Sequence, residues 1–246
     1  MVEDKVEIEH DGARIEALLL RPDRLTRFPG VLFYTDIWGI RPANIGMARR
    51  LADKGFAVLM PNVFFRHGPI QPNGFAPGSE DQRPQLLKTL FQSLTSAQMG
   101  PDGAAYARFL SQHDGVKPGK LGAVGYCYTG AMAVHTAAAM PDMIAAAASF
   151  HGGMLVTDSP DSPHRQLPRI TARLYFGHAV EDGSMTGEQI ATLEQALRDW
   201  HGAFQSEVYE GARHGWTVPG RDVYNELQAE RAFETQVELF DATLKG

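Results

Sequence analysis

Hydrophobic and polar residues alternate at the start of the chain in the pattern of a two-stranded hairpin. Val6–Ile8 and Arg14–Leu20 each place apolar side chains at every second position, and Asp11 and Gly12 lie between them. A period of two is typical of strands with one buried face, and Asp-Gly is a favoured hairpin turn. We therefore expect the chain to open with an antiparallel pair of strands.

After the hairpin, short apolar runs take turns with helical patterns. Further strands are expected at Gly30–Thr35, Phe56–Met60, Lys120–Tyr126, Met143–Phe150, Ile170–Phe176 and Phe204–Tyr209, and helices at Pro42–Lys54, Gln85–Leu94, Gly103–Leu110, Cys127–Met140, Gly187–Trp200 and Asp222–Leu244. This alternation predicts an α/β fold with a mainly parallel sheet and helices on both faces. Because there is no repeat and no dividing linker, residues 1–246 are expected to form one domain. Residues 61–80 carry several prolines and glycines without a period, and we expect them to form part of a pocket rim.

Composition and charge exclude several classes of function. The net charge of −6 argues against a surface for nucleic acid or anionic membrane, which would require clustered Lys and Arg. The charged N-terminus does not resemble a signal peptide, and no apolar run is long enough to span a bilayer, so we expect a cytoplasmic protein. A single cysteine excludes an internal disulfide and a cysteine-based zinc cluster. We expect neither a metal nor a cofactor.

The single cysteine, Cys127, lies where a predicted strand runs directly into a predicted helix. A nucleophile at such a corner needs small neighbours, and Gly125 supplies the space two residues earlier. The start of a helix also favours a thiolate, and it directs the Tyr128 backbone N–H toward a developing oxyanion. The alternative is a buried, inert cysteine, since a Gly–Cys pair at a strand end is common.

Two further sites favour catalysis. His214 follows the last predicted strand, and Asp182 follows the strand before it. Both would lie over the carboxyl ends of the sheet, and the chain order nucleophile, acid, histidine is the order of α/β-hydrolases. Glu181 competes with Asp182 for the role of the acid.

Several stretches of the chain resemble the dienelactone hydrolase family, a cysteine variant of the α/β-hydrolases. The resemblance extends from the Gly30 strand to Trp216, and it is carried by Tyr34–Pro42, Gly55–Asn62, Gly125–Cys127, Tyr175–Gly177 and Ala212–Gly215. It implies an α/β-hydrolase fold with Cys127 as nucleophile, His214 as base and Asp182 as the acid that orients the histidine. It also implies that the backbone amides of Ile37 and Tyr128 form the oxyanion hole.

The chain departs from the family pattern at three places. Thr129 stands where the family usually has a glycine, and a β-branched side chain takes up room in a tight turn. Asp36 stands where family members commonly carry a glutamate that pairs with the resting thiol; it is either that partner or a turn acid. No arginine directly follows His214 to hold a substrate carboxylate, which leaves Arg83 as a candidate.

Aromatic residues and one more histidine complete the predicted pocket. Trp38, Trp216 and Tyr128 are expected around the site, and His151 either lines the pocket or supports it from behind.

The sequence favours an enzyme that hydrolyses a small-molecule ester or lactone through a covalent thioester. Two other classes stay open: a thiol protein that senses oxidants or electrophiles, and a binding protein that kept the fold without catalysis. Ready oxidation without ester turnover would favour the first of these. Retention of all three triad residue types counts against the second. Monomer is the family-like default for the oligomeric state.

Overall fold

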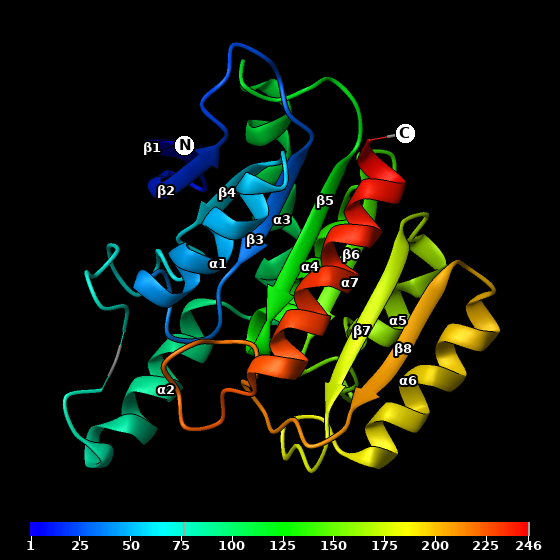
Figure 1. Ribbon diagram of the computed structural model, residues 1–246. Coiled ribbons are helices and arrows are strands. Elements are labelled where there is room, and N and C mark those ends of the chain that lie inside the picture. Colours follow the sequence, from blue (N-terminus) through cyan, green and yellow to red (C-terminus); the bar gives the residue numbers. More distant parts are fainter. Residues whose placement is uncertain (76, 246) are drawn as a thin grey trace.

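One eight-stranded sheet forms the centre of the protein. The computed structural model describes residues 1–75 and 77–245, and its strands lie in the order β1-β2-β4-β3-β5-β6-β7-β8 (Figure 1). Their bounds are β1 Val2–His10, β2 Ala13–Arg21, β3 Gly30–Tyr34, β4 Ala57–Pro61, β5 Leu121–Tyr126, β6 Ile144–Phe150, β7 Arg173–Ala179 and β8 Phe204–Tyr209. β2 pairs antiparallel with both β1 and β4, and every pair from β4 to β8 is parallel.

Helices cover both faces of this sheet. Their bounds are α1 Pro42–Asp53, α2 Arg83–Ser93, α3 Ser96–Gln112, α4 Gly130–Ala139, α5 Pro163–Gln166, α6 Gly187–Trp200 and α7 Glu226–Leu244, with 3-10 turns η1 Glu80–Gln82, η2 Cys127–Thr129 and η3 Leu167–Arg169. Helices α1 and α7 pack on one face, and α3, α4 and α6 pack on the other (Figure 1). The predicted mainly parallel sheet with two helical layers is thus confirmed.

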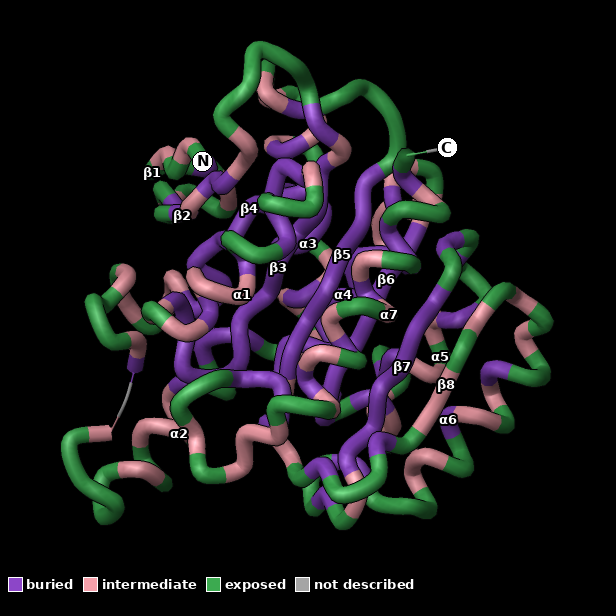
Figure 2. Tube along the Cα trace, in the orientation of Figure 1, coloured by how far each residue is buried: buried purple, intermediate pink, exposed green. Residues whose placement is uncertain are grey.

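The burial of the strands follows from their place in the sheet. All residues of β3, β4 and β5 are buried, because helices cover these strands on both faces (Figure 2). β1 lies at an edge and alternates between exposed and less exposed residues, as its sequence predicts. The predicted hairpin turn is also confirmed, since Asp11 and Gly12 both take positive φ angles of 54° and 70°.

The segment before α2 does not have the role that its sequence predicted. Residues 61–80 were expected at a pocket rim, but the described part of this segment supports the loop after β3 from behind. Phe75 donates its backbone N–H to the carbonyl oxygen of Trp38 at 2.7 Å, and its ring packs edge-on against Phe64. The pocket wall is built instead by the helix that follows, α2.

Helix α3 begins at Ser96, before the predicted Gly103. Thr95 and Gln98 form a capping box that starts the helix, and Pro101 lies inside it. Proline and glycine interrupt the helical pattern in the sequence, so the first turns could not be recognised from periodicity. Within the described residues, no helix combines the length and the apolar character required to cross a membrane.

Candidate active site

Cys127 occupies a strained turn at the carboxyl end of β5. Its φ angle is 60°, in the left-handed region that non-glycine residues rarely adopt. The chain turns so sharply that a Cβ atom on Gly125 would lie 2.0 Å from the backbone oxygen of Thr129. Glycine is therefore required two residues before the cysteine, as the sequence predicts. The turn leaves Cys127 partly exposed at the surface of a cavity.

Thr129 joins this turn to the neighbouring strand. Its side chain is buried, and Oγ1 lies 2.7 Å from the carbonyl oxygen of Thr35 and 3.1 Å from that of Tyr34. The same oxygen accepts the backbone N–H of Tyr126 at 3.2 Å. With a φ of −81°, Thr129 adopts ordinary helical geometry, so the β-branched side chain fits without strain. At this position, where the family usually has glycine, the Thr129 hydroxyl thus connects the turn to the end of β3 through hydrogen bonds.

His214 connects Cys127 to a buried carboxylate. Its Nε2 lies 3.0 Å from Cys127 Sγ, and its Nδ1 lies 2.6 Å from Asp182 Oδ2. Asp182 Oδ1 accepts the backbone N–H of Ser184 at 2.7 Å, so both carboxylate oxygens are bonded. Glu181, the rival acid, is exposed. The structure therefore brings together the three residues that the sequence predicts, from the loops after β5, β7 and β8.

The electrostatics of His214 favour its charged form. Burial alone would lower the pKa of His214, but the hydrogen bonds with Asp182 and Cys127 outweigh burial and raise the pKa to about 10. At neutral pH the imidazole is therefore protonated at both nitrogens. A cation 3.0 Å from the sulfur stabilises a thiolate, which is the nucleophilic form of cysteine.

Ile37 and Tyr128, predicted to form the oxyanion hole, line the same cavity as Cys127 and His214. Within the described residues, the Ile37 amide donates no hydrogen bond, so it is free to serve a ligand. Tyr128 is the second residue of η2, and the first amides of a helical turn have no acceptor inside it. The Tyr128 hydroxyl points elsewhere and donates to the carbonyl oxygen of Leu94 at 2.5 Å.

The expectation that Asp36 pairs with the thiol requires correction. Both of its carboxylate oxygens are bound by the Arg41 guanidinium, at 2.5 and 2.6 Å, and Oδ1 also accepts the backbone N–H of Trp38 at 3.0 Å. The Asp36 side chain is 1% exposed, so this ion pair is nearly buried. Because the Asp36 side chain is one methylene shorter than glutamate, its carboxylate pairs with the nearby Arg41. Asp36 thereby fixes the loop that carries Ile37 and Trp38.

The cavity beside Cys127 has a volume of about 420 Å³ and carries two arginines. Arg83, predicted from the sequence, lies over the Trp38 ring, with its guanidinium carbon 5.5 Å from the ring centroid. Arg221 was not predicted, although it lies in the same loop as His214, seven residues later. The sequence pattern did not indicate Arg221 because the chain makes several turns between His214 and this residue. Leu87 and Phe91 of α2 add an apolar wall that the sequence pattern did not assign.

Two predicted pocket residues lie behind the site instead. His151 is 1% exposed, and its Nε2 is hydrogen-bonded to Thr217 Oγ1 at 2.8 Å. Trp216 is fully buried and packs against the rings of His151 and Tyr209. Neither residue lines the cavity, but His151 packs edge-on against His214, with ring centroids 5.2 Å apart. His151 therefore supports His214 from behind, and Trp216 supports His151.

No cluster of three or more His, Cys, Asp or Glu side chains suited to a metal ion occurs in residues 1–75 and 77–245.

Comparisons with known proteins give matches over nearly the whole chain. The family model described as "Dienelactone hydrolase family" matches residues 15–244. A Synechocystis sp. protein named "Putative carboxymethylenebutenolidase" is 26% identical over 243 residues, which cover 98% of this chain and 96% of the relative. A Bradyrhizobium sp. protein named "Probable 2-oxo-3-(5-oxofuran-2-ylidene)propanoate lactonase" is 25% identical, covering 94% of this chain and 90% of the relative. The crystal structure titled "Putative Dienelactone Hydrolase" from Klebsiella pneumoniae is 25% identical and superposes with a TM-score of 0.86, covering 97% of this chain and 98% of that one. These matches and the sheet confirm the predicted α/β-hydrolase fold.

The role of Asp36 can be tested by replacing it. We expect Asp36→Ala to lower the free energy of unfolding by about 3 kcal/mol, because Arg41 loses its partner in a nearly buried place. Alkylation of Cys127 by iodoacetamide, which has only one cysteine to modify, is expected to change by less than about twofold. Urea unfolding and the alkylation rate measure the two effects, and Arg41→Met is the matched control for stability. A large change in the alkylation rate without loss of stability would show that Asp36 interacts with the Cys127 thiol.

The raised pKa of His214 predicts a pH dependence of stability. We compare His214 with His214→Gln, both in a Cys127→Ala background, so that the thiol does not titrate. The folded chain keeps the His214 proton above pH 6.5, where the unfolded chain loses it, and the stabilisation therefore declines as pH rises. In this background Asp182 is the partner that still raises the pKa of His214, so urea unfolding is expected to show the largest advantage of His214 below pH 6.5 and a declining advantage as pH rises above 6.5. An advantage that stays constant or grows over this range would contradict the raised pKa.

Proposed function

The chain belongs to the dienelactone hydrolase family, and from this premise we propose that it hydrolyses a small carboxylic ester or lactone through Cys127, His214 and Asp182. The observation that carries the proposal is the unbroken hydrogen-bonded chain from Asp182 through His214 to the sulfur at the surface of the cavity. Each member has the chemistry that covalent acyl transfer requires: a nucleophile, a proton carrier and a group that orients the carrier.

In the first half-reaction, the Cys127 thiolate attacks the substrate carbonyl carbon and forms a tetrahedral intermediate. The backbone amides of Ile37 and Tyr128 donate hydrogen bonds to its oxyanion. The carbon–oxygen bond to the leaving group then breaks, and the proton on His214 Nε2 passes to the leaving oxygen. An ester loses an alcohol at this point, whereas a ring-opened lactone stays attached to the sulfur as a thioester.

In the second half-reaction, water hydrolyses the thioester. The now neutral His214 Nε2 removes a proton from the water, and the hydroxide oxygen attacks the thioester carbon. Collapse of this intermediate breaks the carbon–sulfur bond, releases the acid and restores the thiolate beside the imidazolium. Asp182 keeps the Nδ1 proton hydrogen-bonded throughout and fixes the orientation of the ring.

The substrate class follows from the charge of the cavity. Arg83 and Arg221 line it, and among the described residues no carboxylate forms an ion pair with Arg221. Guanidinium groups bind carboxylates with two hydrogen bonds in a fixed geometry. We therefore propose a substrate that carries a carboxylate beside the reacting ester or lactone. The Bradyrhizobium relative is named for a propanoate-bearing lactone, which has this chemistry.

Hydrolysis by a panel of variants tests the triad. We expect the wild type to hydrolyse phenyl acetate, a simple lactone or an unsaturated lactone with a carboxylate, and Cys127→Ala and His214→Ala to lose at least about 1000-fold in kcat. His201→Asn, at the exposed end of α6, is the matched histidine control and is expected to keep full activity. Circular dichroism establishes that each variant is folded. Activity that survives both triad replacements would exclude the mechanism, and no turnover in any protein would favour a thiol sensor or a binding protein.

The arginines can be tested separately from the triad. We expect Arg221→Gln and Arg83→Gln each to raise KM for the carboxylate-bearing lactone by about tenfold or more, through loss of a charged hydrogen bond. KM for phenyl acetate, which has no carboxylate, is expected to stay the same. Arg213→Gln is the matched control, because Arg213 is exposed beside His214 in the sequence but does not line the cavity. Equal effects on both substrates would show that the arginines do not recognise the carboxylate.

A further inference from the structure

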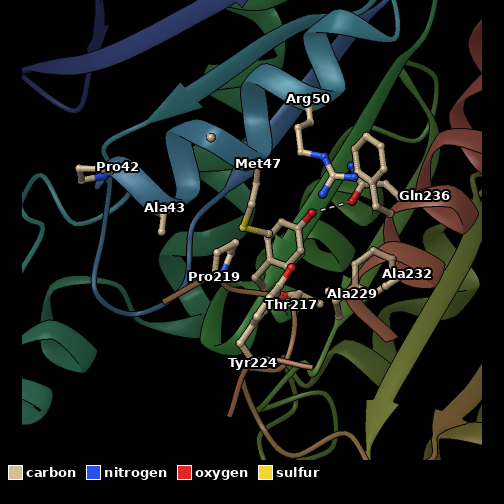
Figure 3. Close-up of a pocket in the computed structure, with 14 residues that line it drawn as sticks. Pro42, Ala43, Met47, Arg50, Thr217, Pro219, Tyr224, Ala229, Ala232 and Gln236 are labelled. Carbon is tan, nitrogen blue, oxygen red and sulfur yellow. Dashed lines mark hydrogen bonds between the residues drawn. The ribbon is translucent and has the colours of Figure 1, made fainter. Parts of the chain in front are cut away.

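A second cavity lies between α1 and α7, and its lining shares no residue with the cavity at Cys127. Its volume is about 330 Å³. The walls are mostly apolar, and Figure 3 shows Ala43 and Met47 of α1 on one side and Ala232 and Gln236 of α7 on the other. Buried residues line its interior, whereas Pro42, Arg50 and Pro219 are exposed.

Gln236, one of the residues that line this cavity, has an unused hydrogen-bond donor. The residue is 1% exposed, and its Oε1 accepts the Tyr126 hydroxyl at 2.6 Å. Burial raises the pKa of Tyr126, so the hydroxyl keeps its proton and remains the donor of this bond. Nε2 of Gln236 is buried and has no hydrogen-bond partner among residues 1–75 and 77–245. A buried unpaired amide is costly, and an acceptor atom of a ligand would satisfy it.

The charge of the cavity favours a neutral ligand. Arg50 is the one charged residue among the described residues that line it. Both terminal nitrogens of Arg50 bind Glu230, at 2.8 and 2.6 Å, and the guanidinium also lies over the Phe233 ring. Its positive charge is therefore neutralised, and little remains to attract an anion.

We propose that this cavity is a second small-molecule site, which binds a neutral one-ring compound through a carbonyl oxygen on Gln236 Nε2. The volume lies at the lower end of the range of ligand cavities, which suits a single ring. The apolar walls contributed by Met47, Ala229 and Ala232 pack against the ring, while the carbonyl accepts the unused amide hydrogen.

Residues that line the second cavity are connected to the site at Cys127, so binding in one is expected to affect the other. Thr217, Pro219 and Tyr224 line the second cavity, whereas Arg221 of the same segment lines the first. Thr217 also bonds His151, whose ring packs against His214. The site and its occupant do not depend on the proposed hydrolysis, because its residues take no part in that reaction.

The test is an NMR titration of the full ¹⁵N-labelled chain with acetophenone and with α-methylstyrene. The two probes have the same shape, but the second has a methylene group in place of the carbonyl oxygen. We expect acetophenone to bind with a dissociation constant of about 1 mM or lower, and to shift amide signals of α1 and α7. α-Methylstyrene is expected to bind about fivefold more weakly, because it cannot accept the Gln236 hydrogen bond.

Two variants and one control locate the site. Gln236→Met keeps the length of the side chain but removes the Nε2 donor, and it is expected to weaken the binding of acetophenone about fivefold and to abolish its preference over α-methylstyrene. Ala43→Phe, at the partly exposed rim, fills the cavity and is expected to prevent binding. Ala97→Phe makes the same change at an exposed position of α3 beside a different cavity, and it is expected to have no effect.

Three outcomes would overturn the proposal: no binding of acetophenone by the wild type, unchanged binding by Ala43→Phe, or equal affinity for the two probes. Hydrolysis is not measured in any of these experiments, so their failure is distinct from failure of the proposed function.

Discussion

The contact between the charged imidazole of His214 and the sulfur of Cys127 is the interaction on which the proposed chemistry depends. A protonated histidine is retained at neutral pH only because Asp182 and Cys127 outweigh the cost of burying it. Asp182 can do this because it is itself buried and bonded at its second oxygen by the Ser184 amide. Without the carboxylate, burial would favour a neutral ring, and the sulfur would lose its cationic partner.

The sheet makes this contact possible because its parallel strands end at one edge. β5 delivers the cysteine in a strained turn, and the loops after β7 and β8 deliver the carboxylate and the histidine. Two buried supports hold the arrangement: the hydroxyl of Thr129, which joins the turn to the end of β3, and the ion pair of Asp36 with Arg41, which fixes the loop that carries Ile37 and Trp38. The segment from Thr217 to Tyr224 contributes residues to both cavities, the one at Cys127 and the one between α1 and α7.

The sequence predicted most of what local patterns and chain order encode. Gly187–Trp200 and Phe204–Tyr209 were predicted with the bounds that the structure has, because their periodicity is strong and their ends are marked. The approach of His214 to both Cys127 and Asp182 followed from the places of the three residues after β5, β7 and β8, at one edge of the sheet. The partners of side chains in irregular loops could not be predicted from the sequence: Asp36 pairs with Arg41 five residues later, and Arg221 reaches the cavity through an irregular loop. Trp216 was expected at the pocket wall but lies behind His214, whereas His151 takes the second of its two predicted places, as a support behind the pocket; sequence gives the neighbourhood of a loop residue and not the direction of its side chain.

A covalent intermediate on Cys127 is the most direct test of this account. Phenyl acetate is mixed with the enzyme, quenched with acid within milliseconds, and the intact protein and its peptides are weighed by mass spectrometry. The account predicts one acetyl group on the peptide that contains Cys127, and removal of that group by hydroxylamine, as expected for a thioester. Hydrolysis without any adduct, or with the acetyl group on another residue, would contradict a cysteine nucleophile.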